Sequence, residues 1–346
     1  MTTLPNRKSF GPSVCLGAAC AIVLLLIIVT PGPLRAQLQW QAAVGAQSAD
    51  LGHQALAFLP NELWIHAGDT VTWASEVDEI HTVTFLRTDP TPQVRLPFPV
   101  GCPGFSSSPA TFDGTTCVTT PPLVKGQQFS VTFPKKGNYK LVCLVHENMT
   151  GVVHVLDALA ALPFDQADYN EQAADQRRDM LTDRDRDGDH DGHHGRREQS
   201  EQILGHGVVA GKGEVTANGG GSQTLSILRF NHDAIRIHSG DTVEWTNDDA
   251  VTPHTITFGT EPADPIPPSG NVTVDQDGAR HVTISSTADS AHSGFIVAAP
   301  QERLFLPQAP LGVTRFRVTF TRAGTYPYIC ALHDDLGMKG TIVVLP

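Results

Sequence analysis

The sequence has little positive charge. Its 24 Lys and Arg stand against 36 Asp and Glu, which gives a formal net charge of −12 with neutral histidines. Proteins that bind nucleic acid neutralise phosphates with a basic surface, so this balance argues against a nucleic-acid partner. The acidity is uneven, because residues 165–201 hold twelve acidic side chains and six Arg, a net of −6. The rest of the chain is only mildly acidic.

Methionine is also scarce, with four residues in a chain of 346. Met1 begins the chain and Met180 lies in the acidic segment. Met149 and Met338 each follow a Cys and a His at close spacing, in two segments that resemble each other. Half of the methionines therefore fall at matching places of a repeat.

The cysteines number six and fall into three pairs. Cys15 and Cys20 lie within or beside an apolar N-terminal run. Cys102 and Cys117 flank the Gly/Ser/Pro-rich stretch GCPGFSSSPATFDGTTC, which in an exported protein predicts a disulfide. The last pair belongs to the repeat, one cysteine in each copy.

The N-terminal segment has the features of an export signal. Arg7 and Lys8 precede an apolar run over residues 14–30, and Arg35-Ala36 offers a cleavage position. This order is typical of a signal peptide that occupies residues 1–36. The run is also long enough to stay in the membrane as an anchor. Either alternative places the bulk of the chain outside the cytoplasm, in the periplasm or the extracellular space.

Two long segments of the chain resemble each other. LAFLPNELWIHAGDTVTWASEVDEIHTVTF matches LRFNHDAIRIHSGDTVEWTNDDAVTPHTITF, and FSVTFPKKGNYKLVC later matches FRVTFTRAGTYPYIC. Apolar and polar residues alternate on both sides of a Gly-Asp pair, at residues 68–69 and 240–241, which is typical of antiparallel strands with a turn. The sequence therefore predicts an all-β protein with a duplicated domain, over residues 38–157 and 204–346.

A helix and a linker are expected between the domains, over residues 158–203. Tyr169, Ala173 and Met180 fall on one stripe of a helix from Asp165 to about Met180. TDRDRDGDHDGHHGRREQSEQ follows and is charged and of low complexity, which is typical of a flexible linker. We therefore expect two domains that are tethered but separate.

Each repeat offers the same four metal-ligating side chains. A Cys, a His and a Met share one loop, and a second His lies upstream in a strand that reads His-Thr-aliphatic-Thr-Phe. Thiolate and thioether are soft ligands and imidazole suits copper, so a trigonal His₂Cys set with a distant axial Met predicts a blue-copper (type 1) electron-transfer site. Structural zinc prefers more thiolates or imidazoles. The candidate copper ligands are His81, Cys143, His146 and Met149 in the first repeat and His254, Cys330, His333 and Met338 in the second.

With these motifs, both repeats resemble cupredoxins, the small blue copper proteins that include plastocyanin, pseudoazurin and amicyanin. CLVHENM has the spacing of the amicyanin loop, and CALHDDLGM has that of plastocyanin. The resemblance implies two Greek-key β-sandwich domains, joined here by the helix and the charged linker, with two copper ions as cofactors. Thr82 and Thr255 depart from the family, which usually places there an Asn that braces the ligand loop.

The resemblance also implies where electrons leave. In cupredoxins the His of the ligand loop projects an edge toward solvent through an apolar patch, and by position these residues are His146 and His333. Asp334 and Asp335, next to His333, are expected to steer a basic partner to the second domain. The apolar residues expected around the two edges are Leu144, Val145, Leu332, Leu336 and Gly337.

The sequence favours a carrier over an enzyme. Two-domain copper oxidases and nitrite reductases bind further copper through His-x-His pairs and through a His beside the blue-copper Cys, and neither feature occurs in this sequence. The predicted function is an exported electron-transfer protein with redox partners such as a cytochrome or an oxidase. One alternative is a copper-binding or delivery protein without an electron-transfer role, which the scarcity of Met disfavours. Another is an electron-donating subunit of a copper oxidase or reductase system.

Overall fold

The computed structural model describes residues 36–87, 102–182, 206–232, 234–298 and 314–346. Residues Gln37–Pro346 form one compact unit. The expectations for the N-terminal segment and for the charged linker concern residues outside the described ranges. Within those ranges no helix has the length and apolar character needed to cross a membrane.

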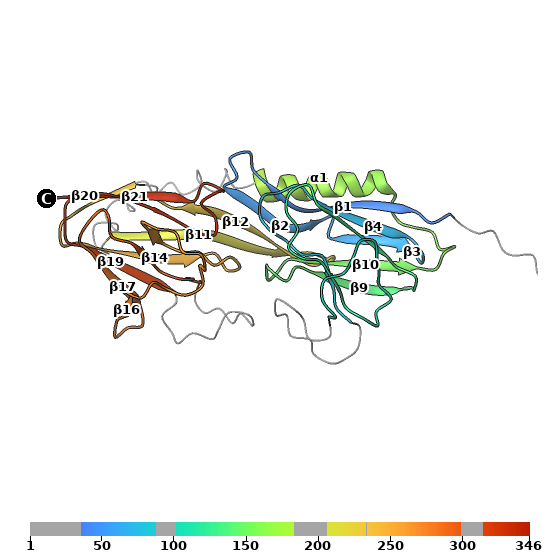
Figure 1. Ribbon diagram of the computed structural model, residues 1–346. Coiled ribbons are helices and arrows are strands. Elements are labelled where there is room, and N and C mark those ends of the chain that lie inside the picture. Colours follow the sequence, from blue (N-terminus) through green and yellow to red (C-terminus); the bar gives the residue numbers. More distant parts are fainter. Residues whose placement is uncertain (1–35, 88–101, 183–205, 233, 299–313) are drawn as a thin grey trace, which may run out of the picture. The chain divides into compact units, whose positions relative to one another are not determined.

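Both repeats fold into β-strands, as their alternating patterns predict (Figure 1). The strands of the first domain are β1 (Gln39–Gln47), β2 (His53–Leu59), β3 (Glu62–His66), β4 (Thr70–Ser75), β5 (Thr84–Phe85), β6 (Ala110–Thr111), β7 (Val118–Thr119), β8 (Gln128–Thr132), β9 (Gly137–Val142) and β10 (Thr150–Leu156). Those of the second domain are β11 (His206–Ala217), β12 (Ser222–Phe230), β13 (Ala234–His238), β14 (Thr242–Asp248), β15 (Thr257–Phe258), β16 (Thr273–Val274), β17 (Arg280–Ile284), β18 (Ala291–His292), β19 (Arg315–Phe320), β20 (Gly324–Ile329) and β21 (Lys339–Leu345).

Each domain is a sandwich of two sheet layers. In the first domain the layers run β3-β10-β9-β5-β7 and β2-β1-β4-β8-β6, and in the second β13-β21-β20-β15-β18 and β12-β11-β14-β19-β17-β16. Equivalent aromatic side chains fill the two cores, Trp73 against Phe85 and Trp245 against Phe258, with ring centroids 5.6 and 5.9 Å apart. The predicted all-β fold with two β-sandwich domains is confirmed.

The Gly-Asp turns join strands of different layers, where the sequence led us to expect antiparallel neighbours. β3 pairs in parallel with β10, while β4 pairs with β1 and β8. Gly68 takes a φ of 95°, and Asp69 Oδ2 accepts hydrogen bonds from the His66 N–H and the Trp40 Nε1–H, both at 3.0 Å. Alternation predicts the strands correctly, but both layers have the same alternation, so it does not tell which layer a strand joins.

The two domains share one sheet, because β2 at the edge of the first domain pairs antiparallel with β12 of the second (Figure 1). Gln54 lies opposite Ser226. Gln54 and Ser226 are as far apart in the sequence as Trp73 and Trp245 are. They are therefore equivalent positions of the repeat. The expectation of separate domains is therefore wrong. Each domain has an open strand edge, and the two edges satisfy each other's backbone groups.

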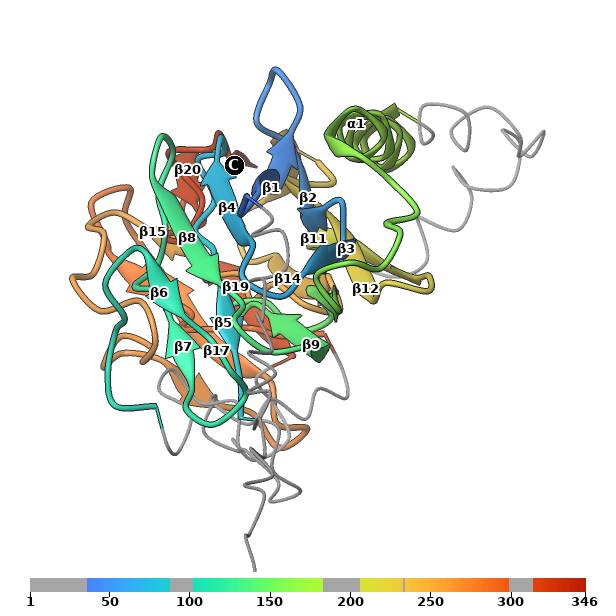
Figure 2. The same cartoon turned by 90° about the vertical axis from the view of Figure 1, so that its right-hand side faces the viewer.

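The helix α1 (Gln166–Thr182) packs on β1 and β2 (Figure 2). Asp165 Oδ1 accepts hydrogen bonds from two N–H groups of the first turn, at 2.7 and 3.1 Å, and so caps the helix. The fully buried Tyr169 donates its hydroxyl to the Trp64 carbonyl at 2.9 Å, and Met180 is buried against alanines of β1 and β2. The predicted helix is confirmed, and it covers a face of β2 that would otherwise meet water.

The disulfide predicted from the loop composition is present. Cys102 and Cys117 are bonded, with Cα atoms 4.8 Å apart, in the connection between β5 and β7. Cys143 and Cys330 are free and buried. Among the residues that the structure describes, the first domain has a disulfide-closed loop and the second domain has none.

Candidate metal centres

In each domain one loop carries three of the predicted ligands and joins the last two strands. Cys143 follows β9 and Met149 precedes β10, and the N–H of Cys143 donates to the Met149 carbonyl at 3.0 Å. Cys330 and Met338 hold the same places between β20 and β21, with the same bond at 3.0 Å. The antiparallel strand pairs thus fix both ends of each loop.

The upstream histidines come from the segment between β4 and β5 and from its counterpart between β14 and β15. His81 pairs with Leu123, whose N–H donates to the His81 carbonyl at 2.7 Å. His254 pairs with Ile296 in the same way, at 2.8 Å. These isolated bridges hold each histidine beside the ligand loop of its domain.

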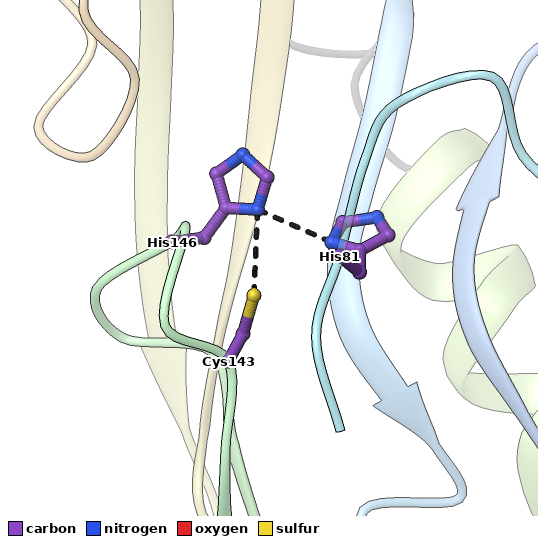
Figure 3. A group of neighbouring side chains, drawn as sticks. All are labelled: His81, Cys143 and His146. Atoms are coloured by element: carbon purple, nitrogen blue, oxygen red, sulfur yellow. Dashed lines mark hydrogen bonds between the residues drawn. The ribbon is translucent and has the colours of Figure 1, made fainter. Parts of the chain in front are cut away.

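In the first domain the donor atoms face one another (Figure 3). The Nδ1 atoms of His81 and His146 are 3.1 Å apart, and Cys143 Sγ lies 3.8 Å from His146 Nδ1. All three donor atoms lie within 4.8 Å of one another, and all three side chains are buried. Met149, also fully buried, ends the same loop. The group is compact enough to surround a single ion.

The second domain repeats this geometry. The Nδ1 atoms of His254 and His333 are 3.2 Å apart, and Cys330 Sγ lies 3.4 and 3.9 Å from the Nδ1 atoms of His333 and His254. Met338 is fully buried at the end of the loop. The structure therefore brings the predicted His and Cys residues together in two separate groups.

The thiols of both groups favour the ionised form. Burial raises the pKa of Cys143, but hydrogen bonds and positive charge from His146 and His81 hold that pKa well below its usual value. The pKa of Cys330 is lowered in the same way by the charge of His333 and the hydrogen bond of His254, against burial. Thiolate is the form that binds metal. Each group thus offers one buried soft anion and two imidazoles, a donor set that fits copper.

Thr82 and Thr255 take over the bracing that the family usually assigns to Asn. The Thr82 hydroxyl accepts a hydrogen bond from the Leu144 N–H at 2.7 Å, and the Thr82 N–H donates to Cys143 Sγ at 3.4 Å. Thr255 makes the equivalent bonds in the second domain, again at 2.7 and 3.4 Å. The departure from the family pattern therefore keeps the sulfur hydrogen-bonded and the loop tied to the upstream strand.

Two glycines that sequence reasoning missed make room for the upstream imidazoles. Gly45 lies in a bulge of β1 with φ 73°, and a Cβ there would lie 2.6 Å from His81 Nε2. Gly211 lies in the corresponding bulge of β11 with φ 76°, and a Cβ there would overlap the His254 ring. A glycine inside an otherwise alternating strand is the signal that could have revealed both.

Glu79 is a further residue that sequence reasoning missed. Its carboxylate lies 3.3 Å from Nε2 of His146 and 3.8 Å from Nε2 of His333, so it contacts both groups. Burial raises the pKa of Glu79, but the hydrogen bond of His146 and the charges of His333 and His146 lower it to about 2. The sequence does contain a signal, an acid two positions before His81 where the second repeat has Thr252.

The structure does not place the edges of the loop histidines in solvent. His146 is 2% and His333 is 3% exposed, because the paired domains turn both edges toward Glu79. A cavity of about 510 Å³ lies at this place and is lined by both domains. Its apolar lining residues include Ile80, Val145, Phe295, Leu332 and Leu336. The solvent-exposed edges expected from the resemblance are therefore wrong for both histidines, whose Nε2 atoms face Glu79 instead.

The fold and the paired donor groups define a tandem cupredoxin. The chain belongs to the plastocyanin/azurin family of copper binding proteins, whose family model matches residues 45–156 and again residues 215–345. A plastocyanin of Scenedesmus fuscus is 30% identical over 117 residues, which cover 34% of this chain and 87% of that protein. The same family therefore appears in both halves of the chain.

Solved structures of amicyanin are also similar to part of the chain. The reduced state of an amicyanin mutant is 22% identical, with a TM-score of 0.23, over 34% of this chain and 82% of that chain. An oxidised amicyanin mutant is 21% identical, with a TM-score of 0.23, over 34% of this chain and 81% of that chain.

Proposed function

We propose that this protein is an exported electron-transfer protein that holds two type 1 copper ions, one in each domain. The observation that carries the proposal is the duplication of one buried donor group, with a thiolate and two imidazoles within 4.8 Å and a buried Met at the end of each loop. A His₂Cys set with a weak axial thioether is typical of blue-copper sites.

When bound, copper supplies one-electron exchange between its Cu(I) and Cu(II) states. The chain holds the donors so that they move little between those states. The strand ends fix each Cys and Met, the isolated bridges fix each upstream His, and the threonines tie the two parts together. All four imidazoles are at most 3% exposed, so little water reaches the metal. Small rearrangement favours fast electron exchange, and burial of the donors disfavours copper delivery.

The location and the partners are part of this proposal. The disulfide between Cys102 and Cys117 supports an oxidising compartment, reached through the N-terminal segment as signal or anchor. The partner would be a redox protein such as a cytochrome or an oxidase, and the chain would have no enzymatic activity of its own. Asp335 is exposed and lies two positions after His333 in the sequence. Its negative charge supports attraction of a basic partner.

Metal counting with visible and EPR spectra tests the proposal. We expect two copper ions per chain and an intense blue absorption in the oxidised protein. Because each thiolate serves one centre, Cys143→Ser and Cys330→Ser should each remove about half of the absorption, and the double variant all of it. A copper-loaded chain without blue colour would contradict type 1 centres.

A further inference from the structure

We propose that Glu79 joins the two centres into one electron-exchange pair, so that an electron received at one centre passes to the other inside the molecule. The inference rests on the proposed function, since both centres must hold copper. The step is balanced within the chain. Cu(I) at one centre is oxidised to Cu(II), Cu(II) at the other is reduced to Cu(I), and one electron moves without a further reactant.

The orientation of the loop histidines supports this path. In each ring Nδ1 faces the Cys sulfur, which leaves the Nε2–H at the opposite end of the ring as a donor. Nε2 of His146 lies 3.3 Å from Glu79 Oε1, and Nε2 of His333 lies 3.8 Å from Glu79 Oε2. Metal-bound histidines commonly donate this N–H to a carboxylate. Here the two oxygens of a single carboxylate face two centres.

Burial keeps this contact in place. The Glu79 residue is 7% exposed, and the two imidazoles beside it are more deeply buried still. A carboxylate is stable in such surroundings only with partners that compensate its charge, and the facing Nε2–H groups provide this compensation. Glu79 also stands two positions before His81 in the chain. It therefore contacts one ligand of each centre and is close in the backbone to a third ligand.

The interface between the domains is held close to the two centres. Arg229, in β12, donates to the Leu336 carbonyl in the second ligand loop at 2.8 Å. The same guanidinium donates to the Asp50 carbonyl of the first domain at 2.5 Å. Together with the pairing of β2 and β12, this arginine fixes the second loop against the first domain. The contacts of Glu79 thus belong to a fixed interface.

Pulse radiolysis of the copper-loaded full chain tests the exchange. Less than one electron per chain is delivered, and its redistribution between the centres is followed in the visible spectrum. We expect redistribution at a rate that does not depend on protein concentration. Glu79→Ala should slow it by about 10- to 100-fold, the range typical when a side chain that supports a metal ligand is lost. Glu79→Gln, which keeps the shape and an acceptor oxygen, should slow it less.

Asp78→Asn is the matched control. This variant removes the same charge one residue away from Glu79. In the parent chain the Asp78 carboxylate accepts hydrogen bonds from Gln47 at 2.6 Å and from Lys125 at 2.9 Å, and not from the loop histidines. The redistribution rate should be unchanged in this variant. The proposal is overturned if Glu79→Ala, with both copper ions bound, keeps the rate of the parent chain, or if the rate of the parent chain rises with protein concentration.

A second measurement does not need copper. In the metal-free chain with ¹⁵N-labelled histidine, Glu79→Gln should shift the Nε2 resonances of both His146 and His333, and much less those of His81 and His254. A shift at only one loop histidine would refute the shared carboxylate. A third copper ion that is lost with Glu79→Gln would also overturn the proposal, because Glu79 would then be a ligand. Absence of blue copper together with shifts at both loop histidines would instead contradict the proposed function and leave the shared carboxylate standing.

Discussion

The two domains have the same donor atoms but different charges around them. Four positions after the buried Trp of each repeat, the first domain has Val77 and the second has Asp249. Asp249 is fully buried, and its Oδ2 lies 3.9 Å from Nε2 of the upstream His254. The first domain instead supplies Glu79 to the loop histidines. Duplication has thus kept the donors and varied the side chains behind them, which tune a metal centre.

The ligand loops differ as well. Two residues separate His146 from Met149, and four separate His333 from Met338. The longer loop folds on itself, with the N–H groups of Leu336 and Met338 both donating to the His333 carbonyl at 3.1 Å. A different loop fold would change how Met338 approaches a bound copper ion compared with Met149, and an axial ligand tunes the potential of a blue-copper site. Two centres of unequal potential are the expected result.

The largest effect is expected from filling the space beside an upstream histidine. Gly211→Ala should abolish copper binding in the second domain, because the new Cβ overlaps the His254 ring. The first domain should keep its copper. The backbone at φ 76° adds a cost of about 1–2 kcal/mol for a residue with a side chain. Copper counting and thermal unfolding measure both effects.

Gly240→Ala controls for the backbone cost. Gly240 has φ 100°, and a Cβ there would meet open space. This variant should lose stability and keep both copper ions. If Gly211→Ala also keeps two copper ions, the role of the glycine in making room for the imidazole is wrong.

The next effect concerns only the first domain. Replacing Cys102 and Cys117 by Ser should lower the free energy of unfolding of that domain by about 3 kcal/mol, because the unfolded chain regains the freedom of the closed loop. Spectra of both copper centres should not change. Calorimetry of the variant, and of the parent chain with and without reductant, measures this change in the free energy of unfolding. An equal decrease in the stability of both domains would show that they unfold together.

Thr82→Val and Thr255→Val should both destabilise their domains, and Thr82→Val somewhat more, because Thr82 also accepts a hydrogen bond from the Thr84 hydroxyl at 3.2 Å. Each removes the hydroxyl that accepts the N–H of the residue after the ligand Cys, at 2.7 Å in both domains. An unsatisfied buried N–H costs about 1–3 kcal/mol. Thr→Ser at either position retains the hydroxyl and serves as the control. Chemical denaturation of the metal-free protein gives both free energies of unfolding, and an unchanged free energy in either variant would contradict the bracing role of that threonine.

The smallest effect is expected from removing the buried charge that distinguishes the second domain. Asp249→Asn removes a buried carboxylate near His254, and the negative charge of this carboxylate would stabilise Cu(II) bound there more than Cu(I). The potential of the second centre should rise by on the order of 60 mV, a tenfold change in a one-electron equilibrium. The potential of the first centre should stay the same. Voltammetry of the full chain measures both, and a rise at the first centre alone would contradict the assignment.

Local features of the sequence explain what could be predicted. Alternation fixed the strands, and the Cys-x-x-His spacing placed both ligand loops, because these patterns involve neighbouring residues. The helix was predicted since Tyr169 and Met180 lie on one stripe, and both are buried. The pairing of β2 with β12 was out of reach, because each strand shows only its own alternation and not its partner. The role of Glu79 depends on that pairing and was missed with it.

The register of β2 against β12 has a further meaning. β2 and β12 are equivalent edge strands, and they pair antiparallel with the equivalent residues Gln54 and Ser226 opposite each other. A symmetric dimer with a twofold axis has the same arrangement. Two identical chains would bring two copies of the Glu79 carboxylate to that axis, where like charges repel in a buried space. In a fused chain the halves need not be identical, and the second half has Thr252 at this place. A symmetric dimer would have either two acidic side chains at this place or none. The fused chain can have a single carboxylate that contacts both donor groups.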